Sequence, residues 1–288
     1  MKSFRLFEEN SLPVMVVRID EQTHMHMHSH EFHEMVIVSD GIGIHCTETE
    51  RYSIERGDVF LIKPGCSHAY EDTAGLNIIN LLYIPEKLKL PLYDLADVPG
   101  FHAFFELEPA LRSQHGFKSR LRISNEKLDY ISSMIKLLED EIQSVRKGRL
   151  YAAASVLMQI ILFVSRSYDK SNSPAQTEIF RLGEALSYIG MNFRRDISLA
   201  RLARKAAMSE TTLYRMFKKS FGVSPVNYVI SLRVAHARKL LESTDMTVSD
   251  IAGDSGFGDS NFFSRTFRSH VGMSPRDYRK RFGDNMKF

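Results

Sequence analysis

The stretches FKKSFGVSPVNY (residues 217–228) and FRSHVGMSPRDY (residues 267–278) repeat one pattern 50 positions apart. An aromatic residue, a glycine, a Ser-Pro pair and a tyrosine coincide in the two copies, at Phe217/Phe267, Gly222/Gly272, Ser224-Pro225/Ser274-Pro275 and Tyr228/Tyr278. Arg215 aligns with Arg265, and upstream Leu202-Ala203 aligns with Ile251-Ala252 at a spacing of 49. A repeated supersecondary unit is the simplest cause of such a match.

Each copy predicts a helix, a tight turn and a second helix, which is the helix-turn-helix arrangement. The first copy has apolar residues at helical spacing and then a break, namely Leu199, Leu202, Ala203 and Ala206 before Met208-Ser209. Ser209 is a suitable N-cap for a helix over 210–219, and Asp259 or Ser260 is the N-cap expected after the turn at 256–258. The expected inward faces are Leu213, Met216 and Phe217 in the first copy and Phe262, Phe263 and Phe267 in the second.

A helix over about 225–242 is expected to join the two units, with Ser224 as its cap and Pro225 in its first turn. Roughly 18 residues at 1.5 Å each give a strut of about 27 Å. Two recognition helices held apart by such a strut can enter successive major grooves, which lie about 34 Å apart. The tandem units therefore predict recognition of an asymmetric DNA site by one chain.

The paired units, the stretch GFGDSNFFSRTFR (256–268) and the two G-x-SP-x-x-Y endings resemble the DNA-binding domain of AraC/XylS-type transcription regulators. The resemblance covers about 195–280 and implies a double-stranded DNA operator as the partner. An activator of this family also implies RNA polymerase as a partner. A helical bundle that binds another protein is the alternative for the same two units.

Residues on the recognition helices that face away from the apolar stripe can reach bases or phosphates. Together with the first cap they are Ser209, Glu210, Thr211, Tyr214, Arg215 and Lys218 in the first unit, and Asp259, Ser260, Asn261, Ser264, Arg265 and Arg268 in the second. Arg215 and Arg265 suit bidentate contacts with guanine or phosphate, and Asn261 suits adenine. Lys218 and Arg268 are better placed for phosphates, which position a protein without specifying sequence.

Charge is distributed unequally along the chain. Residues 178–288 contain 19 Lys+Arg and 11 Asp+Glu, which gives a net charge of +8. Residues 1–177 contain 19 Lys+Arg and 24 Asp+Glu, which gives −5. This asymmetry favours contact of the C-terminal part alone with a polyanion, although solubilising charge is the ordinary explanation.

The N-terminal part alternates short β-rich runs with turn signals between residues 12 and 84, which predicts a β-sandwich or barrel. Within it, HMHMHSHEFHE (24–34) holds five of the eleven histidines. The spacings His28-x-His30-x3-Glu34 and Gly57-Asp58 to Pro64-Gly65-x2-His68 resemble the two motifs of the cupin barrel, a domain that sugar-sensing AraC-type regulators often carry. Together with the stretch at 256–268, residues 28–45 are most similar to regulators of rhamnose and related sugar operons.

The cupin resemblance implies an effector pocket lined by His28, His30, Glu34 and His68, and in that family these residues can bind a divalent metal. Positions 24, 26, 28, 30 and 34 share parity, so on a regular strand they fall on one face, while His33 points away. Three imidazoles and a carboxylate suit Zn, Ni, Mn or Fe, and the ligand types do not select among them. Direct hydrogen bonding to a sugar-like effector without metal, and a purely structural role, are the alternatives. His24 and His26 are expected at the rim or in solvent.

Two helices are expected between the barrel and the DNA-binding part. Residues 125–145 carry an apolar stripe of Leu128, Ile131, Ile135, Leu138, Ile142 and Val145, and 150–168 form a second apolar helix after a short loop. In AraC-type proteins such a hairpin commonly forms a homodimer, and packing against the barrel alone is the alternative. DKSNSPAQT (169–177) is expected to be a linker, and 85–123 shows no pattern that can be aligned.

The expected compartment is the cytoplasm. The apolar run 150–164 is shorter than the roughly 18–20 residues that a membrane span needs, and the N-terminus lacks the apolar core of a secretory signal. Cys46 and Cys66 are too few for a disulfide framework and suit free thiols. We therefore expect no membrane association.

The sequence as a whole predicts a multidomain α+β protein, since 288 residues suffice for about two ordinary domains. We expect a cupin-like effector barrel over 1–105, a helical dimerisation segment and linker over 106–177, and an AraC-type DNA-binding domain over 178–288 with units at about 197–221 and 247–271. The predicted function is that of a sequence-specific DNA-binding activator of a carbohydrate-utilisation operon, which responds to a sugar-like effector bound in the barrel and has no enzymatic activity. The alternatives are a metal-dependent cupin enzyme, or a direct metal or pH sensor, fused to a DNA-binding domain.

Overall fold

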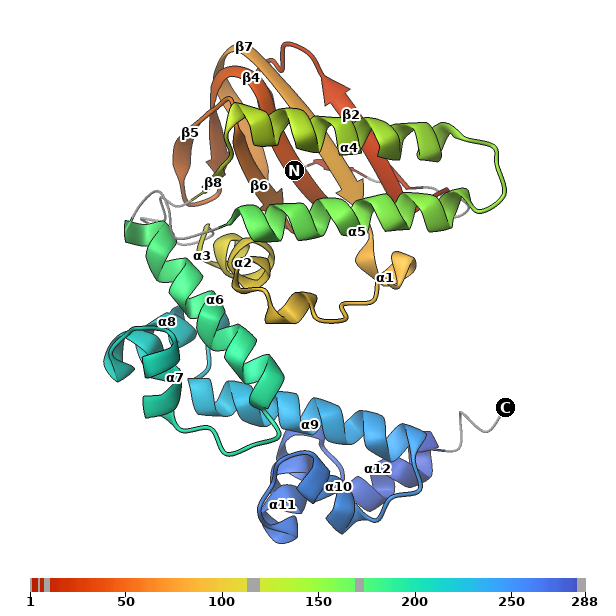
Figure 1. Cartoon of the computed structure of the whole chain (residues 1–288), viewed down its shortest axis with the longest axis vertical. Coiled ribbons are helices and arrows are strands. Elements are labelled where there is room, and N and C mark those ends of the chain that lie inside the picture. Colours follow the sequence, from red (N-terminus) through yellow and green to blue (C-terminus); the bar gives the residue numbers. More distant parts are fainter. Residues whose placement is uncertain (1, 5, 8–10, 113–119, 169–173, 284–288) are drawn as a thin grey trace. The chain divides into compact units, whose positions relative to one another are not determined.

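Two structural units divide the chain, Met1–Gly183 and Glu184–Phe288. The computed structural model describes all residues except 1, 5, 8–10, 113–119, 169–173 and 284–288 (Figure 1). The two units are described separately below.

The N-terminal unit is built on a sheet that has eight strands within the described residues. The strands are β1 (Lys2–Phe4), β2 (Val14–Ile19), β3 (Met25–His30), β4 (His33–Thr47), β5 (Arg51–Glu55), β6 (Asp58–Ile62), β7 (His68–Tyr83) and β8 (Leu121–Arg122). Their order is β1-β3-β7-β4-β6-β8, with β2 paired to β7 and β5 paired to β4. The predicted cupin-like β fold is confirmed.

Strands β4 and β7 are the longest described strands of this sheet, with 15 and 16 residues. They pair antiparallel from His33↔Tyr83 to Thr47↔His68, with register shifts in the middle. Gly41 lies at one of these shifts with a φ of +75°, and a Cβ there would come within 2.0 Å of the Gly75 carbonyl oxygen. Only glycine allows this close backbone approach, which lets β4 bend here and continue as one strand from His33 to Thr47.

Where β4, β6 and β7 are continuously buried, the sheet is covered on both faces. One face carries a core cluster of Val36, Val38, Ile54, Phe60, Ile62, Tyr70, Leu76 and Ile78. Met35, Ile37 and Leu61 are also buried, and because successive side chains on a strand point to opposite faces they lie on the other side of the sheet. Helices cross the sheet on that side (Figure 1), which is why β4 is continuously apolar from Met35 to Val38.

The segment 85–123, for which the sequence offered no pattern, forms short helical turns over residues 85–112. They are α1 (Pro85–Leu88), the 3₁₀ turn η1 (Leu95–Asp97), α2 (Pro99–Phe101), the π-helical turn η2 (His102–Leu107) and α3 (Glu108–Arg112). Turns this short leave no readable periodicity, and Ala103, Phe104 and Leu107 are nevertheless fully buried. Gly100 packs so closely on helix α5 (Arg149–Ser167) that a Cβ would lie 2.0 Å from the Ser165 carbonyl oxygen.

The expected helical hairpin is present as α4 (Asn125–Gln143) and α5. Ser124 caps α4, and the predicted stripe is buried at Leu128, Ile131, Ile135 and Leu138. The prediction was wrong for Val145, which is 96% exposed because α4 ends two residues earlier, at Gln143.

Helix α5 is long and apolar enough to cross a membrane by length and composition, so the expectation that its apolar run is too short was wrong. That expectation counted the run 150–164, whereas the helix has 19 residues. One such helix is weak evidence for a span, because a core helix passes the same test. The buried stripe from Ala153 to Val164 is typical of a core helix.

The C-terminal unit is entirely helical among the residues described. Its helices are α6 (Pro174–Asn192), which begins before the unit boundary, α7 (Leu199–Lys205), α8 (Glu210–Phe221), α9 (Pro225–Ser243), α10 (Val248–Asp254), α11 (Ser260–Val271) and α12 (Pro275–Phe282). The two predicted helix-turn-helix units are therefore α7–α8 and α10–α11, joined by α9. Of the linker predicted at 169–177, residues 169–173 lie outside the described residues, and the expectation was wrong for 174–177, which begin α6.

Capping residues start these helices where the sequence placed them. The Ser209 hydroxyl accepts from the Thr212 N–H at 3.1 Å, the Ser224 hydroxyl from the Asn227 N–H at 3.2 Å, and the Asp259 carboxylate from the Phe262 N–H at 2.5 Å. Asp259 rather than Ser260 is thus the cap of α11. Each cap satisfies a backbone donor that the first helical turn leaves open.

The inward faces agree with prediction except at one position. Leu213, Met216 and Phe217 are buried in α8, and Phe263 and Phe267 in α11. Phe262 is 47% exposed, so its predicted inward position was wrong. Because Phe263 and Phe267 are four residues apart and define the inner face, the preceding residue points about 100° away.

We expect Gly100→Ala to lower the free energy of unfolding by about 1–3 kcal/mol, because the added Cβ meets backbone rather than a movable side chain. Urea denaturation of the full chain measures the change. Gly253→Ala in α10 is the control, since nothing lies within 4 Å of a Cβ there. Equal stability of the Gly100 variant and the parent would contradict this packing.

Candidate functional sites: a polar barrel cavity and two recognition helices

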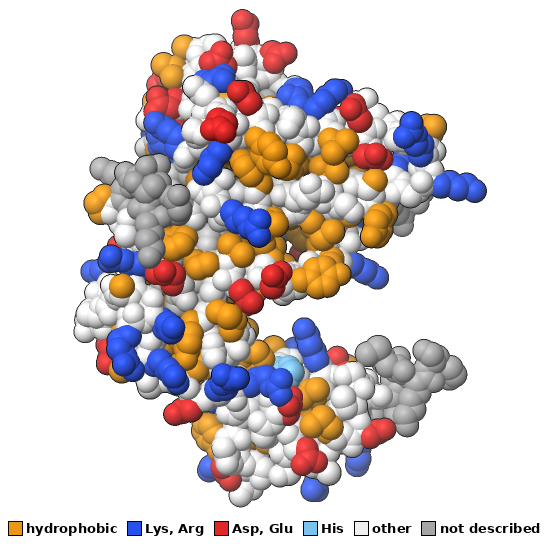
Figure 2. All heavy atoms as spheres, in the orientation of Figure 1, with side chains coloured by type: hydrophobic (Ala, Val, Ile, Leu, Met, Phe, Trp, Pro, Cys, Tyr) orange, Lys and Arg blue, Asp and Glu red, His pale blue; other side chains and the backbone are white. Residues whose placement is uncertain are grey.

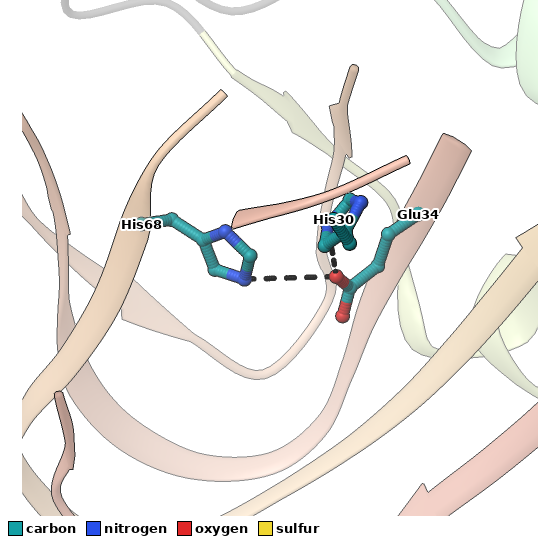
Figure 3. Close-up of side chains that lie close together, drawn as sticks. All are labelled: His30, Glu34 and His68. Atoms are coloured by element: carbon teal, nitrogen blue, oxygen red, sulfur yellow. Dashed lines mark ion pairs between the residues drawn. The ribbon is translucent and has the colours of Figure 1, made fainter. Parts of the chain in front are cut away.

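Three buried side chains converge at one end of the barrel, His30 from the end of β3, Glu34 from β4 and His68 from the start of β7 (Figure 3). The Glu34 Oε2 lies 2.8 Å from His30 Nε2 and 3.6 Å from His68 Nε2. One ligand atom from each residue lies within 4.8 Å of the others. Residues far apart in the sequence thus present two imidazole nitrogens and a carboxylate to one point.

Contacts with Phe32 fix the orientation of the His30 ring. Its Nδ1 lies 2.8 Å from the Phe32 carbonyl oxygen, and the ring stacks on the Phe32 ring at a centroid distance of 4.2 Å. A carbonyl only accepts, so Nδ1 carries the proton and donates, which leaves the Nε2 lone pair directed at the cluster. This tautomer is the one that metal-binding histidines usually adopt.

His68 is held neutral. Burial lowers the pKa of its imidazole from 6.5 to about 4, although the Glu34 carboxylate opposes the shift. At neutral pH the ring therefore offers one donor and one acceptor nitrogen. Imidazole nitrogens and carboxylate oxygens in this arrangement fit a divalent metal, and they equally fit hydrogen bonds with ligand hydroxyls.

The other histidines divide as follows. His28 is buried and its ring lies 4.1 Å from that of His68, but its Nδ1 faces the His26 carbonyl oxygen at 3.0 Å, and it is outside the group of three. His24 and His26 are exposed, in agreement with prediction. His33 points away from the cluster, as its parity predicted, and stacks on Tyr83.

A cavity of about 210 Å³ surrounds this cluster on the inner side of the barrel. Besides His28, His30, Glu34 and His68, it is lined by polar Gln22, Tyr70 and Asn80 and by apolar residues such as Val17, Ile19 and Leu82. The buried Gln22 Oε1 and Asn80 Oδ1 find no hydrogen-bond partner among the described residues. Atoms of this kind, aimed at a cavity, are suited to a ligand that donates hydrogen bonds.

Sequence reasoning missed Gln22, Tyr70, Asn80 and His45 as candidates. Asn80 interrupts the apolar part of strand β7. This could have been recognised in the sequence, because a buried side-chain amide needs a hydrogen-bond partner. His45 is fully buried and its ring centroid lies 5.7 Å from that of His68, on the side of a neighbouring cavity. No spacing rule links His45 to the motif, because bulges in β4 intervene.

The residues expected to contact DNA lie on the outer faces of α8 and α11. Ser209, Glu210, Thr211, Tyr214, Arg215, Lys218, Asp259, Ser260, Asn261, Arg265 and Arg268 are exposed, and Ser264 is half-buried. The Ser264 hydroxyl donates to the Ser260 carbonyl oxygen at 2.9 Å, and Ser209 and Asp259 act as caps. Figure 2 shows several Lys and Arg side chains on the visible surface of the C-terminal unit.

A barrel with a polar cavity and a tandem helix-turn-helix domain together define a DNA-binding transcription regulator with a ligand-binding domain. Comparison with known families agrees: the AraC-like ligand binding domain matches residues 14–139 and the helix-turn-helix domain matches residues 202–281. The chain belongs to the AraC-type family of helix-turn-helix transcriptional regulators, and it is a regulator rather than an enzyme.

Relatives cover nearly the whole chain. The HTH-type transcriptional activator RhaR of Mannheimia succiniciproducens is 30% identical over 280 residues, which span 97% of this chain and 95% of that protein. The HTH-type transcriptional activator RhaS of Escherichia fergusonii is 33% identical over 254 residues, 88% of this chain and 87% of that protein. Among solved structures, the DNA-binding domain of AdpA in complex with a target DNA is 31% identical, with a TM-score of 0.35 over 35% of this chain and 92% of that one.

We expect Glu34→Ala to lower the free energy of unfolding by about 1–3 kcal/mol, because it removes a buried side chain that packs between two imidazoles and leaves a cavity there. Glu34→Gln, which keeps an oxygen acceptor at the same position, should cost less. Thermal unfolding of the full chain compares the two variants. An Ala variant as stable as the Gln variant would show that the carboxylate does not hold this cluster.

Proposed function

We propose that the protein is a cytoplasmic, sequence-specific activator of a carbohydrate-utilisation operon, and that a sugar-like effector binds in the barrel cavity. The supporting observation is the pair of buried acceptors, Gln22 Oε1 and Asn80 Oδ1, that line the cavity without a described partner. Sugar hydroxyls donate hydrogen bonds and would satisfy these atoms. The resemblance to rhamnose-operon regulators favours a deoxyhexose or a related monosaccharide.

The cavity suits a small polyol better than a larger ligand. Its volume of about 210 Å³ lies below the roughly 300–1000 Å³ that drug-sized ligands occupy. Apolar Val17, Ile19 and Leu82 provide a surface for the C–H faces of a sugar ring, while His30, Glu34 and His68 provide donors and acceptors at one end. Binding would alter DNA affinity only if the effector prefers one arrangement of the DNA-binding units.

We propose as a second candidate that the same cluster holds a divalent metal, with His30, Glu34 and His68 as ligands and His28 adjacent. The convergence of the three ligand atoms and the fixed tautomer of His30 support it. A bound ion would act as a Lewis acid for effector hydroxyls, and the ligand types fit Zn, Ni, Mn or Fe.

We expect Asn80→Ala to weaken binding of the sugar about tenfold or more, since one charge-neutral hydrogen bond to a buried acceptor is lost. Isothermal titration of the full chain with 6-deoxyhexoses, hexoses and pentoses identifies the effector and measures the change. Ser53→Ala, on the exposed side of β5, is the matched control.

The same titrations, after chelation and after reloading with Zn, Ni, Mn or Fe, separate the two candidates. Affinity that is lost on chelation and restored by one metal supports the metal site. Affinity that survives chelation supports direct contact. A failure of every sugar to bind, with or without metal, would refute the proposed effector class.

We propose that α8 and α11 read the operator, with Arg215, Arg265 and Asn261 at base edges and with Lys218 and Arg268 at phosphates. Ser209, Glu210, Thr211, Tyr214, Asp259, Ser260 and Ser264 complete the proposed contact surface. The support is their exposure on the two helices whose opposite faces are buried in the core. Helix α9, with 19 residues at about 1.5 Å each, is about 28 Å long, close to the spacing of successive major grooves.

We expect Arg215→Ala and Arg265→Ala each to weaken operator binding by about 1–3 kcal/mol and to relax specificity at one base pair. Lys218→Ala should weaken binding to all sequences and reduce the salt slope by about 1. Fluorescence anisotropy on duplexes selected from a random pool measures both effects. Lys239→Ala, an exposed lysine on α9, should leave both unchanged; loss of binding there would contradict the proposed surface.

We propose that the protein works as a homodimer through the α4–α5 hairpin and that the DNA-bound dimer recruits RNA polymerase. The hairpin exposes large apolar side chains that the barrel does not cover, at Tyr130 (55%), Leu137 (50%) and Tyr151 (82%). Tyr130 and Leu137 are seven residues apart and share one face of α4. An apolar face of this kind is typical of a helix that packs on a partner.

We expect the double variant Leu137→Glu, Tyr151→Glu to be a folded monomer, because it places charges on the proposed contact face. Sedimentation velocity measures the mass, and Gln143→Glu, at an exposed position of the same helix, should remain dimeric. A parent protein that sediments as a monomer at micromolar concentration would refute the dimer.

A further inference from the structure

A second cavity, of about 370 Å³, lies in the N-terminal unit outside the barrel. Its walls come from the ends of strands β4, β6 and β7, from the segment 85–106 and from α5. In Figure 2 hydrophobic side chains surround a hollow on this side of the unit. The cavity, here called the outer pocket, shares no described lining residue with the barrel cavity.

Most of the outer pocket is apolar. Phe101, Phe105, Ile161 and Leu162 form its inner walls, and Leu92 and Tyr93 stand at its mouth, 52% and 85% exposed. A concave apolar surface with a few polar groups is the usual composition of a ligand site. The volume exceeds that of the barrel cavity and falls within the range of about 300–1000 Å³ found for small-molecule sites.

Two polar groups lie side by side in this apolar surround. His33 opens β4 and Lys63 follows β6, and the antiparallel register, which pairs Glu34 with Ile62, places these two residues as neighbours. The buried His33 Nδ1 has no hydrogen-bond partner among the described residues. No described carboxylate lies within ion-pair distance of the Lys63 ammonium. Burial lowers the pKa of both groups, although Glu86 opposes the shift for His33 and Glu106 opposes that for Lys63.

The other charged groups of the outer pocket do not neutralise this end. Glu106 Oε2 lies 2.9 Å from His102 Nδ1 and is engaged there. Asp94 and Arg166 are exposed at the mouth, where water screens them. The inner polar end therefore has one cation and one imidazole and favours an anionic group.

We propose that the outer pocket binds a second small ligand, a monocarboxylic acid with an apolar body, whose carboxylate pairs with Lys63 and His33. The apolar body lies against Phe101, Phe105 and the α5 side chains Ile161 and Leu162. The ammonium donates to one carboxylate oxygen, and the His33 ring donates to the other from the nitrogen that now has no partner. Charge-assisted hydrogen bonds of this kind are stronger than those between neutral groups.

The outer pocket adjoins strand β4, which also lines the barrel cavity, and helix α5, which belongs to the proposed dimer hairpin. His33 and Glu34 are consecutive on β4 and serve the outer pocket and the barrel cavity from opposite faces. Helix α5, which supplies Ile161 and Leu162, also belongs to the hairpin with the exposed apolar face. An acid bound here would thus contact both elements and can modulate the response to the barrel ligand.

The chain contains no tryptophan, so one introduced tryptophan reports on one cavity. Phe101→Trp places the reporter in the outer pocket, and Leu6→Trp places it in the barrel cavity. Octanoate and benzoate are the probes, with octanol and octylamine as neutral and cationic controls. We expect an acid to change the Phe101→Trp fluorescence saturably and to leave Leu6→Trp unchanged, and the alcohol and the amine to bind at least tenfold more weakly.

The Lys63→Met change, made in the Phe101→Trp protein, keeps the apolar stem and removes the charge. It should weaken the acid about tenfold or more and leave the alcohol unaffected, while Lys63→Arg should retain most of the affinity. Raising the melting temperature of the Phe101→Trp protein with acid, and not that of the Lys63→Met variant, would add support. Equal binding of acid and alcohol, a response only at Leu6→Trp, or no binding of any probe would overturn the proposal.

Discussion

The alternation of side chains along β4 determines where this protein can hold small molecules. From Glu34 to Val38 the strand is covered on both faces, by the barrel interior on one side and by helices on the other, so each of these residues belongs to one of two enclosed spaces. Glu34 enters the barrel cavity and His33 the outer pocket, only because the side-chain period of a strand is two. The long pairing with β7 fixes this assignment, and the separate pairing of β3 with β7 places His68 opposite His28.

Buried polar groups distinguish the barrel cavity from an ordinary core. An amide oxygen in an apolar interior without a partner costs roughly 1–3 kcal/mol, so Gln22 and Asn80 reduce stability unless a ligand satisfies them. The His30 Nδ1 shows the opposite solution, since the protein itself supplies its partner, the Phe32 carbonyl oxygen. The cavity therefore combines a preformed polar end with acceptors that remain open, which is the arrangement of a site that gains stability on binding.

The C-terminal unit followed closely from the sequence because its determinants are local. Caps at Ser209, Ser224 and Asp259 and apolar spacing within each helix need no knowledge of distant residues, and the repeat allowed one copy to check the other. The error at Phe262 arose where two adjacent phenylalanines compete for one inward position.

In the barrel, the resemblance located His30, Glu34 and His68, whereas Asn80 and His45 depend on bulges and on the pairing of distant strands. The turns between 85 and 112 carry no period, so the outer pocket could not be foreseen.

Helix α9 contributes to the interior of both helix-turn-helix units. Near its start the Tyr228 ring packs on Phe217 of α8 at a centroid distance of 5.6 Å, and further along Val234, Ala237 and Leu241 join the cluster around Phe263 and Phe267. A helix shared in this way makes the unfolding of one half expose the core of the other. The two helix-turn-helix units should accordingly unfold in one cooperative transition. A destabilising substitution in the core of either unit would then weaken the DNA contacts of both.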